Sequence, residues 1–123
     1  MILVDTSIWI DHFRRTEPQL VHLLDQCEVV MHPFVLGELV LGHVPGIGGM
    51  IDDLSRLPQA TAASAHEVLR FIMERKLSGL GIGYVDAHLL ASAALMSETL
   101  IWTRDKRLLA AAQSLSLSVA MRE

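Results

Sequence analysis

The strongest constraint on this chain is a short apolar run that ends abruptly at a carboxylate. Ile2, Leu3 and Val4 are all apolar, two of them are β-branched, and Asp5 follows directly. A run that is apolar at every position is typical of a strand buried on both faces of a parallel sheet. Similar runs recur at 29–31, 99–102 and 117–120, and a weaker one lies at 60–63.

Helix signals occupy the segments between these runs. Thr6 and Ser7 offer N-cap side chains for a helix to about residue 13, and Ser64 with Glu67 forms a capping box for a later helix. Further helices are expected at 18–27, 33–42, 50–57, 84–96 and 105–113. This alternation predicts an α/β fold, a three-layer α/β/α sandwich around a mostly parallel central sheet.

Apolar spacing predicts which helix faces meet the core. In the helix after Glu17, the leucines at 20, 23 and 24 form a stripe that Cys27 continues, so this cysteine is expected in the core. In the helix after Ser64, the expected apolar side combines Ala65, Val68, Leu69 and Ile72.

Composition narrows the class of protein. A length of 123 residues predicts one domain spanning 1–123, and a single cysteine excludes a disulfide framework or a thiolate zinc cluster. The longest stretch without charge, 108–121, is too short to cross a membrane, and the start lacks a signal peptide's basic region, so a cytoplasmic protein is expected. The net charge of −4 argues against a protein that binds nucleic acid through bulk positive charge.

Four carboxylates fall where such a fold places its ligand sites, beyond the carboxyl ends of the strands. Asp5 ends the first strand, Glu38 and Asp86 lie on helices among apolar neighbours, and Asp105 follows the strand at 99–102. Converging carboxylates repel, and a divalent cation with all-oxygen ligands, Mg²⁺ or Mn²⁺, would compensate them. Taken singly, each acid has an ordinary interpretation, because Asp86 could complement a helix N-terminus and Asp105 could be an N-cap.

Four sequence motifs carry a resemblance to a known family. They are Val-Asp-Thr-Ser-Ile-Trp-Ile-Asp-His at 4–12, Gly-Glu-Leu-Val-Leu-Gly at 37–42, Gly-Tyr-Val-Asp-Ala-His at 83–88 and Trp-Thr-Arg-Asp at 102–105. In order and spacing they resemble PIN-domain ribonucleases, particularly the VapC-type toxins of type II toxin–antitoxin modules. The match spans essentially the whole chain, which makes it far more specific than any one motif alone.

The resemblance implies roles for matching residues. Asp5 and Asp86 would be the main ligands of Mg²⁺, with Mn²⁺ as a substitute, and Glu38 and Asp105 would complete the catalytic acidic cluster. The hydroxyls of Thr6 and Thr103 would orient a carboxylate or a metal-bound water, although helix capping explains both threonines nearly as well. Members of the family hydrolyse RNA, are silenced by a cognate antitoxin and commonly form homodimers.

Basic residues near the expected site could hold RNA phosphates. Arg104, Lys106 and Arg107 bracket Asp105, and Arg14 with Arg15 follows the first helix. An ordinary solvated helix face explains these residues equally well.

Three other functions remain for the same sequence. A receiver-type phosphoacceptor domain needs paired acids after its first strand and a lysine after its last, and neither is found here. A haloacid-type phosphatase needs a second aspartate at the position of Ser7. A catalytically inactive PIN interaction module would be expected to lack one of the four acids. Without those four acids the chain has ten acidic and ten basic residues, so its acid excess lies entirely in the proposed site.

Overall fold

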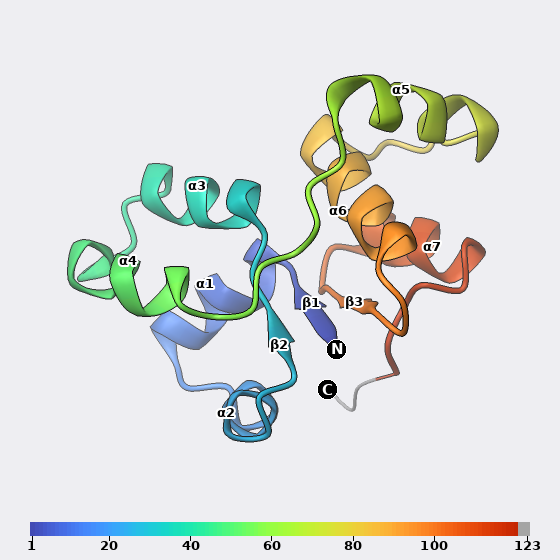
Figure 1. The fold of residues 1–123 in the computed structure, drawn as a ribbon. Helices are drawn as coiled ribbons and strands as arrows, with labels where there is room; N and C mark the ends of the chain where they lie inside the picture. The colour runs from blue at the N-terminus through green and yellow to red at the C-terminus, as the bar shows by residue number, and fades with distance from the viewer. Residues whose placement is uncertain (121–123) are drawn as a thin grey trace.

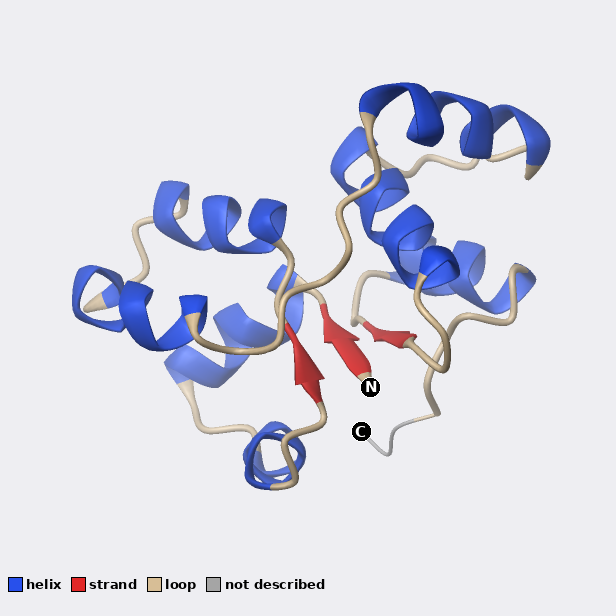
Figure 2. Ribbon diagram, viewed as in Figure 1, coloured by secondary structure: helices blue, strands red, loops and turns tan. Residues whose placement is uncertain are grey.

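The computed structural model describes residues 1–120, and three short parallel strands form its centre (Figure 2). Strand β1 (Ile2–Val4) lies between β2 (Val29–Val30) and β3 (Leu100–Trp102), so the order is β2-β1-β3. Isolated parallel bridges, Met31 to Gln59 and Ile101 to Ser118, extend the pairing at both edges. The apolar runs at 2–4, 29–31 and 99–102 are thus confirmed as the buried centre of the fold.

Seven helices surround this sheet within the described part of the chain. They are α1 (Thr6–Arg14), α2 (Pro18–Asp25), α3 (Pro33–Leu41), α4 (Ile47–Ser55), α5 (Ala65–Glu74), α6 (Tyr84–Leu95) and α7 (Lys106–Ser114). The helices form two groups, with α1 to α4 beside β2 and α5 to α7 beside β3 (Figure 1). The predicted three-layer α/β/α arrangement is confirmed. None of the helices in residues 1–120 is long and apolar enough to span a bilayer.

Two expected strands are reduced to single bridges. The segment at 60–63 is no strand, because its chain pairs with Met31 only around Gln59 and then crosses to the second helix group, where α5 begins (Figure 1). The run at 117–120 likewise pairs with β3 only through the bridge at Ser118. Helix α4 begins three residues earlier than expected, directly after Gly46, whose φ of +77° makes the preceding turn.

Two expectations about burial are wrong. Cys27 is exposed, because α2 ends at Asp25 and a positive φ of 56° at the cysteine turns the chain away from the helical stripe. Leu69 is 53% exposed, since α5 packs instead through Val68 with Phe71 and Ile72. In both cases the spacing of apolar residues fits a helical stripe, but α2 ends before Cys27 and α5 packs through a different set of apolar residues.

A buried histidine joins the two helix groups. His32 lies at the N-cap of α3, where its Nδ1 accepts a hydrogen bond from the backbone N–H of Phe34 at 3.0 Å. The ring proton therefore resides on Nε2, which donates to the hydroxyl of Ser92 in α6 at 3.1 Å. The side chain has no solvent exposure, and burial, with a smaller contribution from nearby His88, lowers the pKa of His32 to about 4.

This joint predicts an acid-sensitive fold. The pKa of His32 is 6.5 in the unfolded chain and about 4 in the folded protein, so the unfolded chain takes up a proton first as the pH falls. The resulting stabilisation is complete above pH 6.5 and is lost between pH 6.5 and 4, by about 3 kcal/mol in total. Urea unfolding at pH 7 and 5 measures this loss.

The matched variant is His32→Asn, which keeps a side-chain acceptor at the N-cap but cannot titrate. It should show a smaller fall in unfolding free energy between pH 7 and 5 than the wild type, whereas His66→Asn, at an exposed position, should behave as the wild type does. An equal fall in the wild type and His32→Asn would exclude His32 as the source.

Candidate active site

The site begins where β1 and β3 end side by side. Val4 is paired with Trp102, and the backbone N–H of Asp5 donates to the carbonyl of Trp102 at 2.9 Å. The next residues, Asp5 and Thr103, therefore leave the sheet together at its carboxyl edge. This is the edge at which the sequence predicted a site.

Two hydroxyls fix the carboxylate of Asp5. Its Oδ2 accepts hydrogen bonds from Thr103 Oγ1 at 2.7 Å and from Ser7 Oγ at 2.8 Å. The aspartate is only 6% exposed, so these bonds supply part of the solvation that an ionised carboxylate loses on burial. Among the described residues no hydrogen bond reaches Oδ1, which leaves that oxygen as the one able to accept a cation.

Glu38 is held in a similar way from the start of α1. The hydroxyl of Thr6 donates to Glu38 Oε1 at 2.7 Å and so links α1 with α3. Thr6 and Ser7 were expected to cap α1, but Asp5 occupies the N-cap position and makes no side-chain capping bond. Both hydroxyls bind carboxylates instead, because the strand end brings those acids within reach.

Asp86 lies in the first turn of α6. Burial raises the pKa of Asp86; a hydrogen bond from the backbone N–H of Gly83, at 3.3 Å, acts in the other direction. The charges of Asp5, Asp105 and Glu38 each raise that pKa further. The four predicted acids, drawn from four segments of the chain, therefore lie within electrostatic reach of one another.

Asp105 is the most exposed of the four acids, and it also caps a helix. It is the N-cap of α7, where its Oδ1 accepts from the backbone N–H groups of Arg107 and Leu108 at 2.9 and 3.0 Å. The capping interpretation of Asp105 is thus confirmed. Its charge still reaches Asp86, so capping and membership of the cluster are compatible.

The donor set suits a hard divalent cation that keeps much of its water. Within residues 1–120, no group of three acidic, histidine or cysteine side chains is arranged to grip an ion directly. Mg²⁺ usually retains several waters and needs only one or two protein carboxylates. Carboxylate oxygens in mutual repulsion, with one oxygen of Asp5 left without a donor, fit such an ion.

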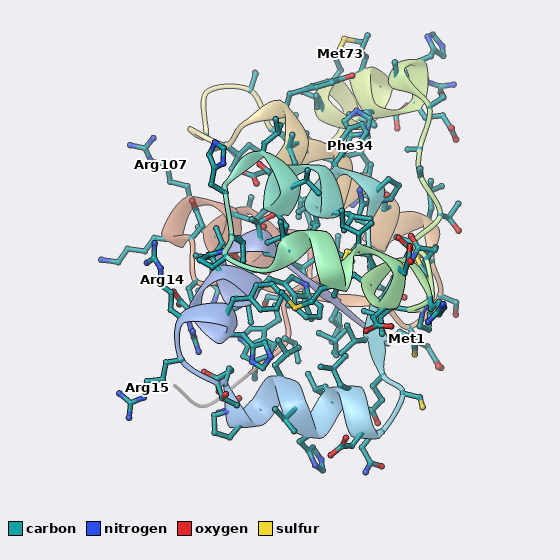
Figure 3. The ribbon with its side chains drawn as sticks, turned by 90° about the vertical axis from the view of Figure 1, so that its left-hand side faces the viewer. Met1, Arg14, Arg15, Phe34, Met73 and Arg107 are labelled. Carbon is teal, nitrogen blue, oxygen red and sulfur yellow. The ribbon has the colours of Figure 1, made fainter. Side chains whose placement is uncertain are left out.

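Four of the predicted RNA-contacting residues are exposed, and the fifth is engaged elsewhere. Arg14, Arg15, Lys106 and Arg107 are all exposed, and Figure 3 shows Arg14, Arg15 and Arg107 extending outward on one side of the molecule. The guanidinium of Arg104 instead forms ion pairs with two acids of the α1–α2 region. Its predicted contact with phosphate therefore receives no support from its geometry.

Four residues around the site were not assigned there from the sequence: Ser7, Asp11, Glu17 and His32. Ser7 had a usable signal, because a hydroxyl two residues after a strand-end aspartate can return to its carboxylate. The contacts of Asp11 and Glu17 with Arg104 join positions 87 or more residues apart, and no local pattern marks them.

Comparison with known proteins identifies the family. The PIN domain profile matches residues 2–113. The chain belongs to the PIN-domain family. It is 45% identical over 120 residues to Ribonuclease VapC32 of Mycobacterium tuberculosis, in strains CDC 1551/Oshkosh and ATCC 25618/H37Rv, covering 98% of this chain and 97% of that protein. No solved structure gives a significant match. The resemblance of this PIN domain to VapC-type toxins is confirmed.

Repulsion in the acidic cluster predicts that Asp86→Asn stabilises the protein when metal is absent. The amide removes a partly buried charge that faces three carboxylates but keeps an oxygen for the N–H of Gly83. We expect Tm in EDTA at pH 7 to rise by a few degrees. Thermal unfolding followed by circular dichroism measures this change.

The control is Asp52→Asn, which removes an exposed charge on α4. It should leave Tm nearly unchanged. A fall in Tm for Asp86→Asn in EDTA would show that the charge of Asp86 is compensated within the protein and that the cluster needs no cation.

Proposed function

We propose that this protein is a Mg²⁺- or Mn²⁺-dependent endoribonuclease and the toxin of a toxin–antitoxin module, acting in the cytoplasm on RNA. One observation carries the proposal: the four acids at 5, 38, 86 and 105 lie within electrostatic reach at the carboxyl edge of the sheet. The similarity to a protein named ribonuclease over 98% of the chain supports RNA as the substrate. That the chain forms a single domain over 1–123 remains a prediction.

Asp5 and Asp86 would hold the cation, and Glu38 and Asp105 would complete its surroundings. A bound Mg²⁺ supplies an activated water and neutralises charge on the phosphoryl oxygens. The protein's own contribution is orientation, because Thr103 fixes Asp5 and Thr6 fixes Glu38 through hydrogen bonds of 2.7 Å. Either Glu38, which is held by one hydroxyl at Oε1, or Asp105 would orient the attacking water.

The exposed basic residues would position the RNA backbone. Arg14, Arg15, Lys106 and Arg107 lie on α1, at its C-cap and in the first turn of α7. Phosphate contacts from such side chains fix the register of a nucleic acid without reading its sequence. Local positive charge beside an acidic centre allows an overall acidic protein to bind RNA.

Apolar surface supports the two expected protein partners. A hollow of about 250 Å³ between α1, α2 and α4 offers a docking site for an antitoxin segment, and it is lined by Trp9, His12, Phe13, Leu24, Met50, Asp53, Leu54 and Leu57. Exposed apolar side chains on α3 and α5, including Leu41 at 80% and Met73 at 74%, support a homodimer. Analytical ultracentrifugation of the protein by itself tests the homodimer, and a second run with the product of an adjacent small reading frame tests the antitoxin. A monomeric mass in both runs would contradict both partners.

Cleavage of a structured RNA tests the proposed activity. Purified protein should cleave it with Mg²⁺ or Mn²⁺ and stop when EDTA is added. Asp5→Asn should lower the rate by more than about 100-fold, because even residues that only orient a metal ligand typically contribute 10- to 100-fold. Circular dichroism should show an unchanged fold.

Asp52→Asn is the matched control, since it removes one exposed carboxylate on α4 that belongs to none of the site motifs. This variant should retain full activity. Full activity in Asp5→Asn, or cleavage that continues in EDTA, would contradict the assignment of the metal site.

A further inference from the structure

Arg104 lies in the middle of the Thr-Arg-Asp turn that follows β3 and binds two carboxylates on another part of the chain. Its Nη1 donates to Asp11 Oδ2 at 2.8 Å and its Nη2 donates to Glu17 Oε2 at 2.5 Å. The guanidinium also lies over the ring of Trp102, with 5.9 Å from Cζ to the ring centroid. Each of the two terminal nitrogens of the guanidinium thus binds a different acid, and the side chain is only 27% exposed.

The acids that bind Arg104 are themselves fixed. Glu17 is the N-cap of α2, where its Oε1 accepts from the backbone N–H of Gln19 at 3.2 Å, and its own N–H donates to His12 Nδ1 at 3.1 Å. The hydrogen bond from Arg104 lowers the pKa of Glu17, so the acid stays ionised and the pair persists. Arg104 therefore fastens the turn after β3 to the corner between α1 and α2.

The same turn sets the oxygen atoms around Asp5. The backbone N–H of Arg104 donates to Ser7 Oγ at 3.2 Å, and that hydroxyl donates to Asp5 Oδ2. Its neighbour Thr103 donates to the same oxygen and also accepts from the N–H of Asp105 at 3.0 Å. A shift of this turn would therefore displace the Thr103 hydroxyl and disturb the hydrogen bond that the Arg104 N–H donates to Ser7.

We propose that Arg104 is a positioning residue that clamps the turn after β3 to Asp11 and Glu17 and thereby sets the orientation of Asp5. This inference rests on the proposed ribonuclease function and replaces phosphate binding as the role of Arg104. Two carboxylates already surround the guanidinium, so the trio carries a net negative charge that opposes attraction to a phosphate. A planar fork that bonds two acids at once is a task for arginine rather than lysine.

The test compares Arg104→Gln, Glu17→Gln, the double variant and Arg104→Lys. Glu17→Gln keeps a carbonyl oxygen to cap α2 but removes the charge that holds Arg104. Arg70→Gln serves as the control, because it removes an exposed arginine whose ion pair with Glu74 lies on α5, outside the proposed site. Each variant is measured for kcat and KM on one RNA in Mg²⁺ and for Tm in EDTA without RNA.

A clamp predicts that Arg104→Gln lowers kcat about 10-fold or more while KM stays within about twofold. Glu17→Gln should lower kcat in the same direction, and the double variant should be no worse than Arg104→Gln. Tm in EDTA should show the same coupling, with the loss in the double variant smaller than the sum of the single losses. Arg104→Lys should recover little of kcat, since one ammonium cannot bond both acids in fork geometry.

A phosphate contact predicts the opposite pattern. Arg104→Gln would then raise KM, Arg104→Lys would restore it, and Glu17→Gln would lower KM by releasing the guanidinium for RNA. That pattern, or additive losses of Tm, would overturn the clamp. If the wild type fails to cleave RNA while the Tm losses of the variants are coupled, the proposed function is contradicted, but the Arg104 clamp stands as a structural link.

Discussion

The hydrogen bond between Thr103 and Asp5 is the interaction on which the rest of the site depends. It joins the first residues beyond two neighbouring parallel strands, and the register of β1 with β3 brings those residues together. Because Asp5 is almost fully buried, its carboxylate needs fixed donors, and the hydroxyls of Thr103 and Ser7 supply them. An oxygen oriented in this way costs little reorganisation when a cation arrives.

Glu38 and Asp86 reach Asp5 because their two helices are joined to each other. His32 caps α3 and bonds to Ser92 in α6, and these helices carry Glu38 and Asp86. Burial contributes most to the raised pKa of Asp86, and the charges of Asp5, Asp105 and Glu38 raise it further, so these carboxylates repel one another. The fold thus accumulates a charge that a divalent cation would relieve, and the overall charge of −4 equals the charge of these four acids.

Much of this arrangement could be read from the sequence, for particular reasons. The apolar run at 2–4 fits only a buried strand. The motifs at 4–12 and 83–88 lie where a strand ends or a helix begins, and local sequence determines those boundaries. The position of Cys27 was not predictable, because one residue in a left-handed conformation ends the stripe of α2. The partners of Arg104 were equally hidden, since ion pairs between residues 87 and 93 positions apart depend on tertiary packing.

Binding of Mn²⁺ to the purified protein without RNA is the most direct measurement of the central claim, that a fixed Asp5 and its neighbouring acids form a cation site. Electron paramagnetic resonance at pH 7 measures the free ion as protein is added. The account predicts saturable binding that Mg²⁺ displaces and that Asp5→Asn abolishes, with Asp52→Asn behaving as the wild type. Equal Mn²⁺ binding by the wild type and Asp5→Asn would contradict it.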